Sequence, residues 1–346
     1  MKDIIFYKVI ERGSCCMSKL SLSFACWDYD RIHALTNGSV QVEGIDLNWL
    51  NMPVEETFWR MMRHQEFDVA ELSLSSYLVA KDRGYPNFTA IPVFMSRFFR
   101  HSGIYINKNS GIKKPEDLKG KRVGIPEYQL TACLWIRGIL QHDYGVHPAD
   151  MNWYIGGQET AGRIEKIKLD LPWNINIRQI DDNQTLNQML ESGEIDAFIA
   201  PRAPSCFLEG SPNVQRLFPD YPAVEKEYYK RTGIFPIMHV VAIKDEILAE
   251  HPWVAQNLFK AFEQAKQKVY EGFKQTAALK VTLPWFTSEW ENTRELMGED
   301  FWPYGLENNR QTLEAAVAYS YEQGMIKNQL KIEDLFAKST LEKYTL

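Results

Sequence analysis

The sequence predicts an α/β protein of two lobes, each built on a mixed, mostly parallel β-sheet flanked by helices. The chain has 346 residues, 45% of them apolar, and single cores rarely grow beyond about 250–300 residues. Strand-like and helix-like segments alternate in two successive series, which is typical of parallel βαβ units. Residues 66–73 (EFDVAELS) and 193–201 (GEIDAFIAP) hold matching places in the two series.

The first series contains three strands, each followed by a helix. Residues 20–26 (LSLSFAC) alternate in the manner of a strand, and a polar loop at residues 27–30 leads into a helical pattern. The strand–helix pairs are expected at residues 20–26 and 31–35, 45–50 and 55–63, and 67–72 and 75–81.

The second series begins after Gly103 and ends where the chain returns to the first lobe. Its expected strands are residues 104–106, 122–125, 175–180 and 195–199, and its expected helices are residues 115–118, 130–140 and 184–190. A strand at 238–243 and helices at 252–273 and 313–322 complete the first lobe. The predicted organisation is a tail at 1–19, lobe 1 at 20–102 and 234–346, and lobe 2 at 103–233.

Composition favours a small-molecule partner. The net charge is −6 and 24% of residues are charged, without the clustered Lys and Arg of a nucleic-acid binder. The five cysteines form no C-x-x-C pair, so neither a disulfide framework nor a zinc site is expected; they are Cys15, Cys16, Cys26, Cys133 and Cys206.

A cytoplasmic location is expected. Lys8, Glu11 and Arg12 interrupt the short apolar run at residues 4–7, and no export signal follows. No stretch of 18 apolar residues occurs, so no contact with a membrane is expected. Met17 is a second possible start, which makes the first sixteen residues a tail or a misassigned start.

Sequence motifs for common enzyme classes are absent. There is no G-x-S-x-G, P-loop or G-x-G-x-x-G pattern. The histidines show no metal-ligand spacing, so no metal site is predicted. A divalent metal held by Glu71, His101 and His239 stays open as an alternative.

Three basic residues crowd the expected hinge between the lobes: Arg97, Arg100 and His101. A guanidinium pairs with a carboxylate through two charge-assisted hydrogen bonds, so these residues are candidates for binding an anion. Solvated linker charges are the alternative. Arg202 holds the matching place beyond the second lobe's strand, and could instead cap a helix or pair with Glu209.

Strand ends carry the candidate acids and bases, because ligands of doubly wound sheets bind beyond the carboxyl ends of strands. Glu71 ends an apolar strand and must be paired or functional, since a buried carboxylate is costly alone. Asp28 follows the first strand and could equally be a helix N-cap. His239 has apolar neighbours and is a candidate proton carrier or a hydrogen-bonded core histidine. Thr131 could donate to an anion at a helix start, or simply cap that helix.

Several segments carry a resemblance to known families. Residues 115–127 (PEDLKGKRVGIPE) and the paired strands resemble the type II periplasmic-binding-protein superfamily, which implies a two-lobed fold with a ligand cleft. A closer resemblance is to the 4,5-dihydroxyphthalate decarboxylase family, carried by WDYDRIHAL (27–35), ELSLSSYL (71–78), SRFFRHSGIYIN (96–107), GIPEYQLTACLWIRGIL (124–140) and TGIFPIMHVVAI (232–243).

The resemblance implies non-oxidative decarboxylation of a hydroxylated aromatic dicarboxylate in the cleft, without an organic cofactor. An acid must protonate the carbon that loses CO₂, and a base must accept a phenolic proton. The expected catalytic residues are His101, His239, Glu71 and Asp28. The expected substrate-binding residues are Arg97, Arg100, Arg202, Thr131, Tyr128 and Trp27.

Other functions remain open at this point. The same fold serves non-catalytic solute binding or sensing of a small anionic aromatic ligand, and a third option is an enzyme like the pyrimidine-synthase branch of the superfamily. Expected partners are a small aromatic dicarboxylate and neither nucleic acid nor membrane, with homo-oligomer formation left open.

Overall fold

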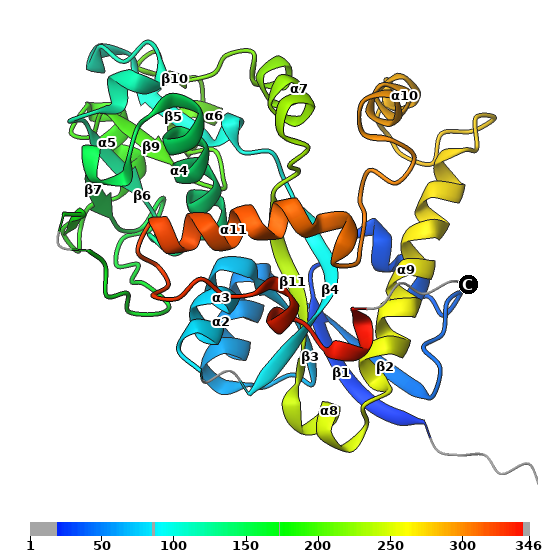
Figure 1. Ribbon diagram of the computed structural model, residues 1–346. Helices are drawn as coiled ribbons and strands as arrows, with labels where there is room; N and C mark the ends of the chain where they lie inside the picture. Colours follow the sequence, from blue (N-terminus) through cyan, green and yellow to red (C-terminus); the bar gives the residue numbers. More distant parts are fainter. Residues whose placement is uncertain (1–18, 85–86, 173, 342–346) are drawn as a thin grey trace, which may run out of the picture.

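The computed structural model describes residues 19–84, 87–172 and 174–341. Two β-sheets lie in separate parts of the molecule, the six-stranded sheet at the upper left of Figure 1 and the five-stranded sheet below it. The predicted tail at residues 1–19 lies outside the described residues except for Lys19, as do Cys15 and Cys16.

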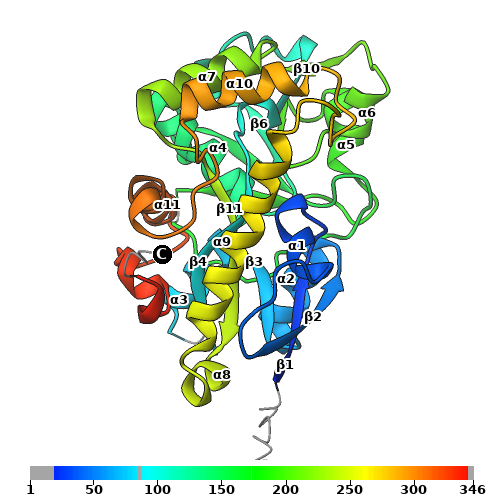
Figure 2. The ribbon, with the colours of Figure 1, turned by 90° about the vertical axis from the view of Figure 1, so that its right-hand side faces the viewer.

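The five-stranded sheet has the order β2-β1-β3-β11-β4. Its strands are β1 (Leu20–Cys26), β2 (Ile45–Asn51), β3 (Val69–Ser73), β4 (Phe88–Arg97) and β11 (Ile237–Lys244). β1 runs parallel to β2 and β3, so their carboxyl ends meet at one edge, whereas β11 runs antiparallel to β3 and β4. Five helices cover this sheet (Figure 2): α1 (His33–Thr36), α2 (Val54–His64), α3 (Leu74–Asp82), α8 (Asp245–Glu250) and α9 (Val254–Phe273).

The six-stranded sheet has the order β10-β5-β9-β6-β7-β8. Its strands are β5 (Ile104–Asn107), β6 (Arg122–Ile125), β7 (Asn152–Ile155), β8 (Asn176–Gln179), β9 (Ala197–Ile199) and β10 (Val214–Arg216). β9, β6, β7 and β8 are parallel, and β5 is antiparallel to β9 and β10. The helices here are α4 (Thr131–Tyr144), α5 (Leu186–Ser192), α6 (Ser205–Leu208) and α7 (Tyr221–Thr232).

Two C-terminal helices lie outside this pattern. α11 (Arg310–Glu322) crosses between the sheets and packs on both α3 and α4. α10 (Phe286–Met297) stands apart from both sheets in Figure 1 and has no buried residue.

The sequence missed the ten-residue strand β4, because Pro92 weakens its strand pattern. Proline lacks the N–H that a central strand donates, so it is confined to sheet edges. β4 is the edge strand of its sheet, where this lack is tolerated. The helix expected at residues 31–35 is instead a 3₁₀ turn, Asp30–Ile32, followed by the single turn of α1.

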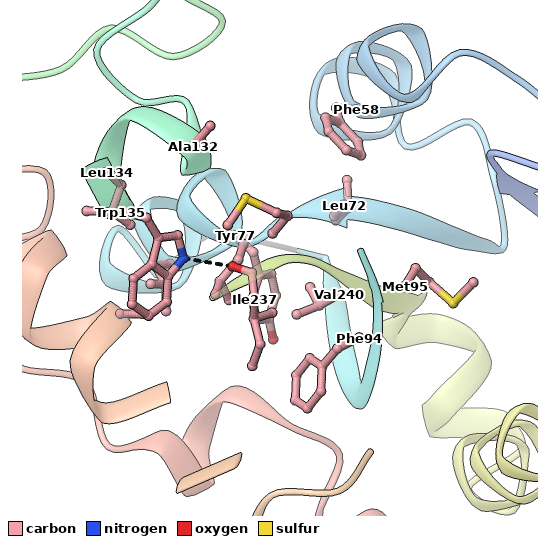
Figure 3. Close-up of a cluster of buried hydrophobic side chains, with 14 of the residues drawn as sticks. Phe58, Leu72, Tyr77, Phe94, Met95, Ala132, Leu134, Trp135, Ile237 and Val240 are labelled. Atoms are coloured by element: carbon pink, nitrogen blue, oxygen red, sulfur yellow. Dashed lines mark hydrogen bonds between the residues drawn. The ribbon is translucent and has the colours of Figure 1, made fainter. Parts of the chain in front are cut away.

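One apolar core runs from the first sheet into the second. Figure 3 shows Trp135 of α4 beside Ile237 of β11, with its indole N–H bonded to the Ile237 carbonyl at 2.9 Å. Trp135 is fully buried. This contact joins α4, which belongs to lobe 2, to β11, the strand with which the chain returns to lobe 1.

Gly138 sets how closely α4 and α11 approach each other. A Cβ at this position would lie 2.0 Å from Tyr319 Cδ2. Alanine in a helix interior is otherwise more favourable than glycine by about 1 kcal/mol.

We therefore expect Gly138→Ala to lower the free energy of unfolding by about 1–3 kcal/mol, as overpacked core positions do. Urea denaturation of both proteins measures the change. The same substitution in a Tyr319→Leu background should cost much less, and an equal loss in both backgrounds would contradict the steric explanation.

Candidate functional site

Glu71, at the end of β3, is fully buried and receives three hydrogen bonds. Its Oε1 accepts from the Tyr29 hydroxyl at 2.6 Å and lies 2.6 Å from His239 Nδ1. Its Oε2 accepts from the Trp27 backbone N–H at 3.1 Å. These donors offset the cost of burying a carboxylate. The sequence predicted that Glu71 is either paired or functional, and the structure shows that it is paired.

The sheet topology brings these groups together. Trp27 and Tyr29 follow β1, whose carboxyl end lies beside that of β3. In the antiparallel pair β3–β11, His239 lies opposite Ser73 and Val241 opposite Glu71. Because side chains alternate along a strand, Glu71, Ser73 and His239 share one face.

The bond to Glu71 determines the tautomer of His239. A carboxylate only accepts hydrogen bonds, so Nδ1 carries a proton and Nε2 is left to meet a ligand. The imidazole packs edge-on against Phe58 of α2 at 4.7 Å between ring centroids. Its side chain keeps 16% exposure, so it is not sealed in the core. A histidine oriented by a carboxylate is suited to carry a proton to or from a substrate.

Hydroxyl groups join the lobes beside this pair. Thr131, the first residue of α4, has its Oγ1 2.9 Å from both Ser73 Oγ and Ser75 Oγ. The Thr131 hydroxyl also accepts from the Ser75 backbone N–H at 3.2 Å. The predicted role of Thr131 in substrate binding stays a prediction, and its hydroxyl lies next to the face that carries His239.

A cavity of about 360 Å³ opens between the lobes. Glu55 of α2 faces lobe-2 residues across it, with ion pairs to Arg202 at 3.1 Å and to Arg163 at 3.5 Å. Other lining residues are Pro126, Leu130, Gly157, Gln158 and Pro201. Glu71 and His239 do not line this cavity, but two residues near them adjoin its lining in the sequence. Phe58, which packs on His239, lies one helical turn beyond Glu55, and Thr131 directly follows Leu130. A larger cavity, about 680 Å³, runs along α9, and none of the predicted site residues lines it.

Arg97 is buried and ties the hinge to the C-terminal segment. Its guanidinium donates to the carbonyls of Phe235 at 3.1 Å and Pro303 at 2.8 Å, and to the Asn309 side chain. Burial lowers the pKa of Arg97 to about 9. Both terminal nitrogens of the Arg97 guanidinium are therefore bonded to acceptors of the protein itself.

Arg100 is nearly buried and has weaker partners. Its Nε lies 3.2 Å from Met238 Sδ and its Nη1 lies 3.4 Å from the Pro201 carbonyl, beside the interlobe cavity. Its guanidinium stacks on Phe98 at 4.6 Å. Burial lowers the pKa of Arg100 to about 10, so it remains a cation at neutral pH. Neither polar partner neutralises that charge.

His101 lies apart from the Glu71 hydrogen bonds. Its ring packs on Phe218 and Tyr228, and neither ring nitrogen has a hydrogen-bond partner among the described residues. The Glu225 carboxylate lies 3.9 Å from its Nδ1. Burial, with Arg231 nearby, lowers the pKa of His101 to about 4.

The remaining predicted residues occupy different settings. Trp27 is 46% exposed, and its backbone N–H is the group that contacts Glu71. Asp28 bonds His33 Nε2 at 2.8 Å on the surface. Tyr128 is buried beneath the Arg137 guanidinium at 3.7 Å. Arg202 pairs with Glu55, whereas the sequence had suggested Glu209 or a helix end as its alternative partners.

The sequence did not select Tyr29, Phe58, Glu55 or Arg163. Tyr29 had a usable signal, because it lies two residues after Trp27 in the same strand-end loop. Glu55 and Phe58 belong to an ordinary amphipathic helix, and Arg163 to an irregular loop. Glu55 and Arg163 pair between the lobes, whereas Phe58 packs on His239 within lobe 1, and no local pattern encodes either contact.

Within the described residues, no three side chains of His, Cys, Asp or Glu gather as ligands for a metal ion. Glu71 and His239 lie in contact, whereas His101 packs on Phe218 and Tyr228, and the absence of a metal stays a prediction. Across the same part of the chain, no helix has the length and apolar character needed to cross a membrane.

Comparison with known proteins agrees with the two-lobed fold. Residues 45–163 match a family model described as the periplasmic substrate-binding protein of phosphonate ABC transporters. The crystal structure of the periplasmic aliphatic sulphonate-binding protein of Escherichia coli matches with a TM-score of 0.53 at 12% identity, over 94% of this chain and 99% of that one. The alkanesulfonate-binding protein of Xanthomonas axonopodis pv. citri gives 0.51 at 12%, over 92% and 98%. The predicted fold class is confirmed.

Two relatives are much more similar in sequence. A 4,5-dihydroxyphthalate decarboxylase of Comamonas testosteroni is 42% identical over 330 residues, covering 95% of this chain and all of the relative. A protein of the same name from Pseudomonas putida is 47% identical over 214 residues, covering 62% of this chain and 83% of the relative. The chain belongs to the 4,5-dihydroxyphthalate decarboxylase family.

Proposed function

We propose that this chain is a non-oxidative carboxy-lyase that removes one carboxylate from a hydroxylated aromatic dicarboxylate, with 4,5-dihydroxyphthalate as the first candidate. The observation that carries the proposal is the Glu71–His239 pair, 2.6 Å apart where β3 ends, in a chain of this family. We further propose a cytoplasmic location, no organic cofactor and no metal. Homo-oligomer formation is compatible with this function.

His239 is assigned as the acid of the reaction. The ring hydroxyl para to the leaving carboxylate gives its proton to solvent, which returns it to the product phenolate, and so supplies electron density to the ring. Imidazolium Nε2–H gives its proton to the ring carbon that bears the leaving carboxylate. The bond from that carbon to the carboxylate then breaks, CO₂ leaves, and the bonding electrons restore the aromatic ring. One proton is consumed per CO₂ released, and solvent returns it to His239. Glu71 holds the imidazole and stabilises its charged form.

Substrate carboxylates are assigned to cations around the cavity. Arg100 is a nearly buried cation whose present partners, a thioether and a carbonyl, are neutral. Arg202 is 63% exposed and held by Glu55, whose place a substrate carboxylate could take. Trp27, an exposed residue whose backbone N–H bonds Glu71, is assigned to the aromatic ring because its indole offers a flat apolar surface. Closure of the lobes around the ligand would exclude water from the reaction.

The test is CO₂ release from 4,5-dihydroxyphthalate by the purified protein, with and without chelator. We expect turnover that chelator leaves unchanged, and a loss of about 10²–10⁴-fold in kcat for His239→Asn because general acid catalysis is removed. Calorimetry should show that the variant still binds the substrate. The matched control is His142→Asn, since His142 Nε2 also lies 2.6 Å from a carboxylate, Glu322, but on the surface.

Tight binding without CO₂ release by the wild-type protein would favour the solute-binding or sensor function instead. Turnover abolished by chelator would overturn the metal-free assignment. Full activity of His239→Asn would remove His239 from the proton-transfer step.

Arg100→Gln should weaken substrate binding by about tenfold to a hundredfold, because a charge-assisted hydrogen bond contributes about 1.5–3 kcal/mol. Calorimetry in a His239→Asn background measures the dissociation constant without turnover. Arg178→Gln, on an exposed position of β8, is the control. Unchanged affinity in Arg100→Gln would exclude contact with a substrate carboxylate.

The proposal leaves His101 outside the reaction and gives it a role in stability. A histidine with an ordinary pKa of 6.5 and a folded-state pKa of about 4 binds its proton more readily when unfolded. Wild-type stability should therefore fall as the pH drops from about 6.5 to 4, by about 3 kcal/mol from this group. His101→Leu should lose less stability over the same range in urea titrations, while His33→Gln should behave as wild type. Equal acid sensitivity in His101→Leu would contradict this assignment.

A further inference from the structure

We infer that Tyr29 is a positioning residue for proton transfer, because its hydroxyl shares the Glu71 oxygen that holds His239. Its kinetic consequence rests on the proposed function. Its effect on the protonation of His239 can be measured without any substrate.

The geometry brings two donors to one acceptor atom. Glu71 Oε1 is 2.6 Å from the Tyr29 hydroxyl oxygen and 2.6 Å from His239 Nδ1. The hydroxyl of Tyr29 therefore competes with the imidazole for the same negative charge. Trp27 N–H binds the other oxygen, so it fixes the carboxylate plane without this direct competition.

Neighbouring groups hold the Tyr29 ring in place. The Arg31 guanidinium lies 4.1 Å from the centre of the Tyr29 ring and 4.4 Å from that of Trp302. Arg31 Nε also donates to the Met95 carbonyl at 2.8 Å. Arg31 is thus fixed by the β4 backbone, and the phenol beneath it is held toward Glu71.

Tyr29 remains a donor throughout the working pH range. Burial and the adjacent Glu71 charge raise the pKa of its hydroxyl far above the ordinary value. The other titratable or charged groups around the pair are Cys26 at the end of β1, Asp28 and Arg31. Burial, then the Glu71 charge, also raises the pKa of the Cys26 thiol, which keeps it neutral. Asp28 is bonded to His33.

The sign of the effect follows from the shared charge. The phenol draws off part of the Oε1 charge, so Glu71 stabilises the imidazolium less than a carboxylate without that bond would. Without the phenol, His239 would hold its proton more tightly and would be a weaker acid toward the substrate.

The experiment is Tyr29→Phe, followed by ¹⁵N NMR of histidine-labelled protein and by the pH profile of kcat. We expect the midpoint of the His239 titration to rise by about 0.5–1 pH unit, as loss of a hydrogen bond to a charged partner implies. The alkaline limb of the kcat profile should move up by the same amount. On the plateau, kcat should fall about threefold to thirtyfold, with little change in KM.

Tyr77→Phe is the matched control. Tyr77 is also a buried tyrosine, and its hydroxyl accepts from the Ala90 backbone N–H at 3.1 Å, but it does not contact Glu71. The Tyr77→Phe substitution should lower the melting temperature and leave the midpoint of the His239 titration unchanged. A midpoint unchanged in Tyr29→Phe, or shifted equally in Tyr77→Phe, would overturn the inference.

A second route applies if Tyr29→Phe does not fold. Incorporation of 3-fluorotyrosine in place of tyrosine keeps the shape and makes the phenol a stronger donor, so the His239 midpoint should move down. An upward or absent shift would contradict the inference. If the wild-type protein releases no CO₂, the proposed function fails, while the NMR midpoints still decide the role of Tyr29.

Discussion

The buried carboxylate of Glu71 is the constraint on which the candidate site depends. A charge with no access to water is stable only if the protein supplies its hydrogen bonds. Here the donors come from the loop after β1 and from β11. The same bonds that make Glu71 tolerable orient His239 and leave its Nε2 available, so the stability of the site and its proposed chemistry have one physical origin.

The segment that joins the two sheets also contains buried charges, here the cations Arg97 and Arg100. Arg97 donates from both terminal nitrogens to carbonyls and to Asn309, and so joins β4 to the segment before α11. Arg100, three residues later, has a sulfur and a carbonyl as its hydrogen-bond partners among the described residues, with the Glu225 charge acting on it from nearby. Two arginines in one short segment thus have different surroundings, one structural and one suited to receive an anion. The contact of Trp135 with Ile237 holds the lobes together nearby.

The binding-protein architecture is well suited to an enzyme that must exclude water. Its two sheets contribute their strand ends and helix starts to one boundary, where Glu55 reaches across to Arg163 and Arg202. The polar groups for proton transfer belong to lobe 1, whereas the arginines opposite Glu55 belong to lobe 2. Closure of the lobes is therefore the step that would bring an anionic substrate against His239.

The sequence by itself determined the fold class and most strands and helices, and it selected Glu71 and His239 as candidate site residues. These follow from local periodicity, from the high cost of an unpaired acid at a buried strand end, and from five segments that resemble one family. It could not separate Arg97 from Arg100, nor His101 from His239, because each pair has similar residues in similar local patterns. Only the tertiary structure decided which guanidinium donates to several protein acceptors, which imidazole bonds Glu71, and that Tyr29 shares this carboxylate. The physical reason is that burial and hydrogen-bond partners depend on the pairing of distant strands, 45 residues apart for β1 and β3 and more than 160 residues apart for β3 and β11.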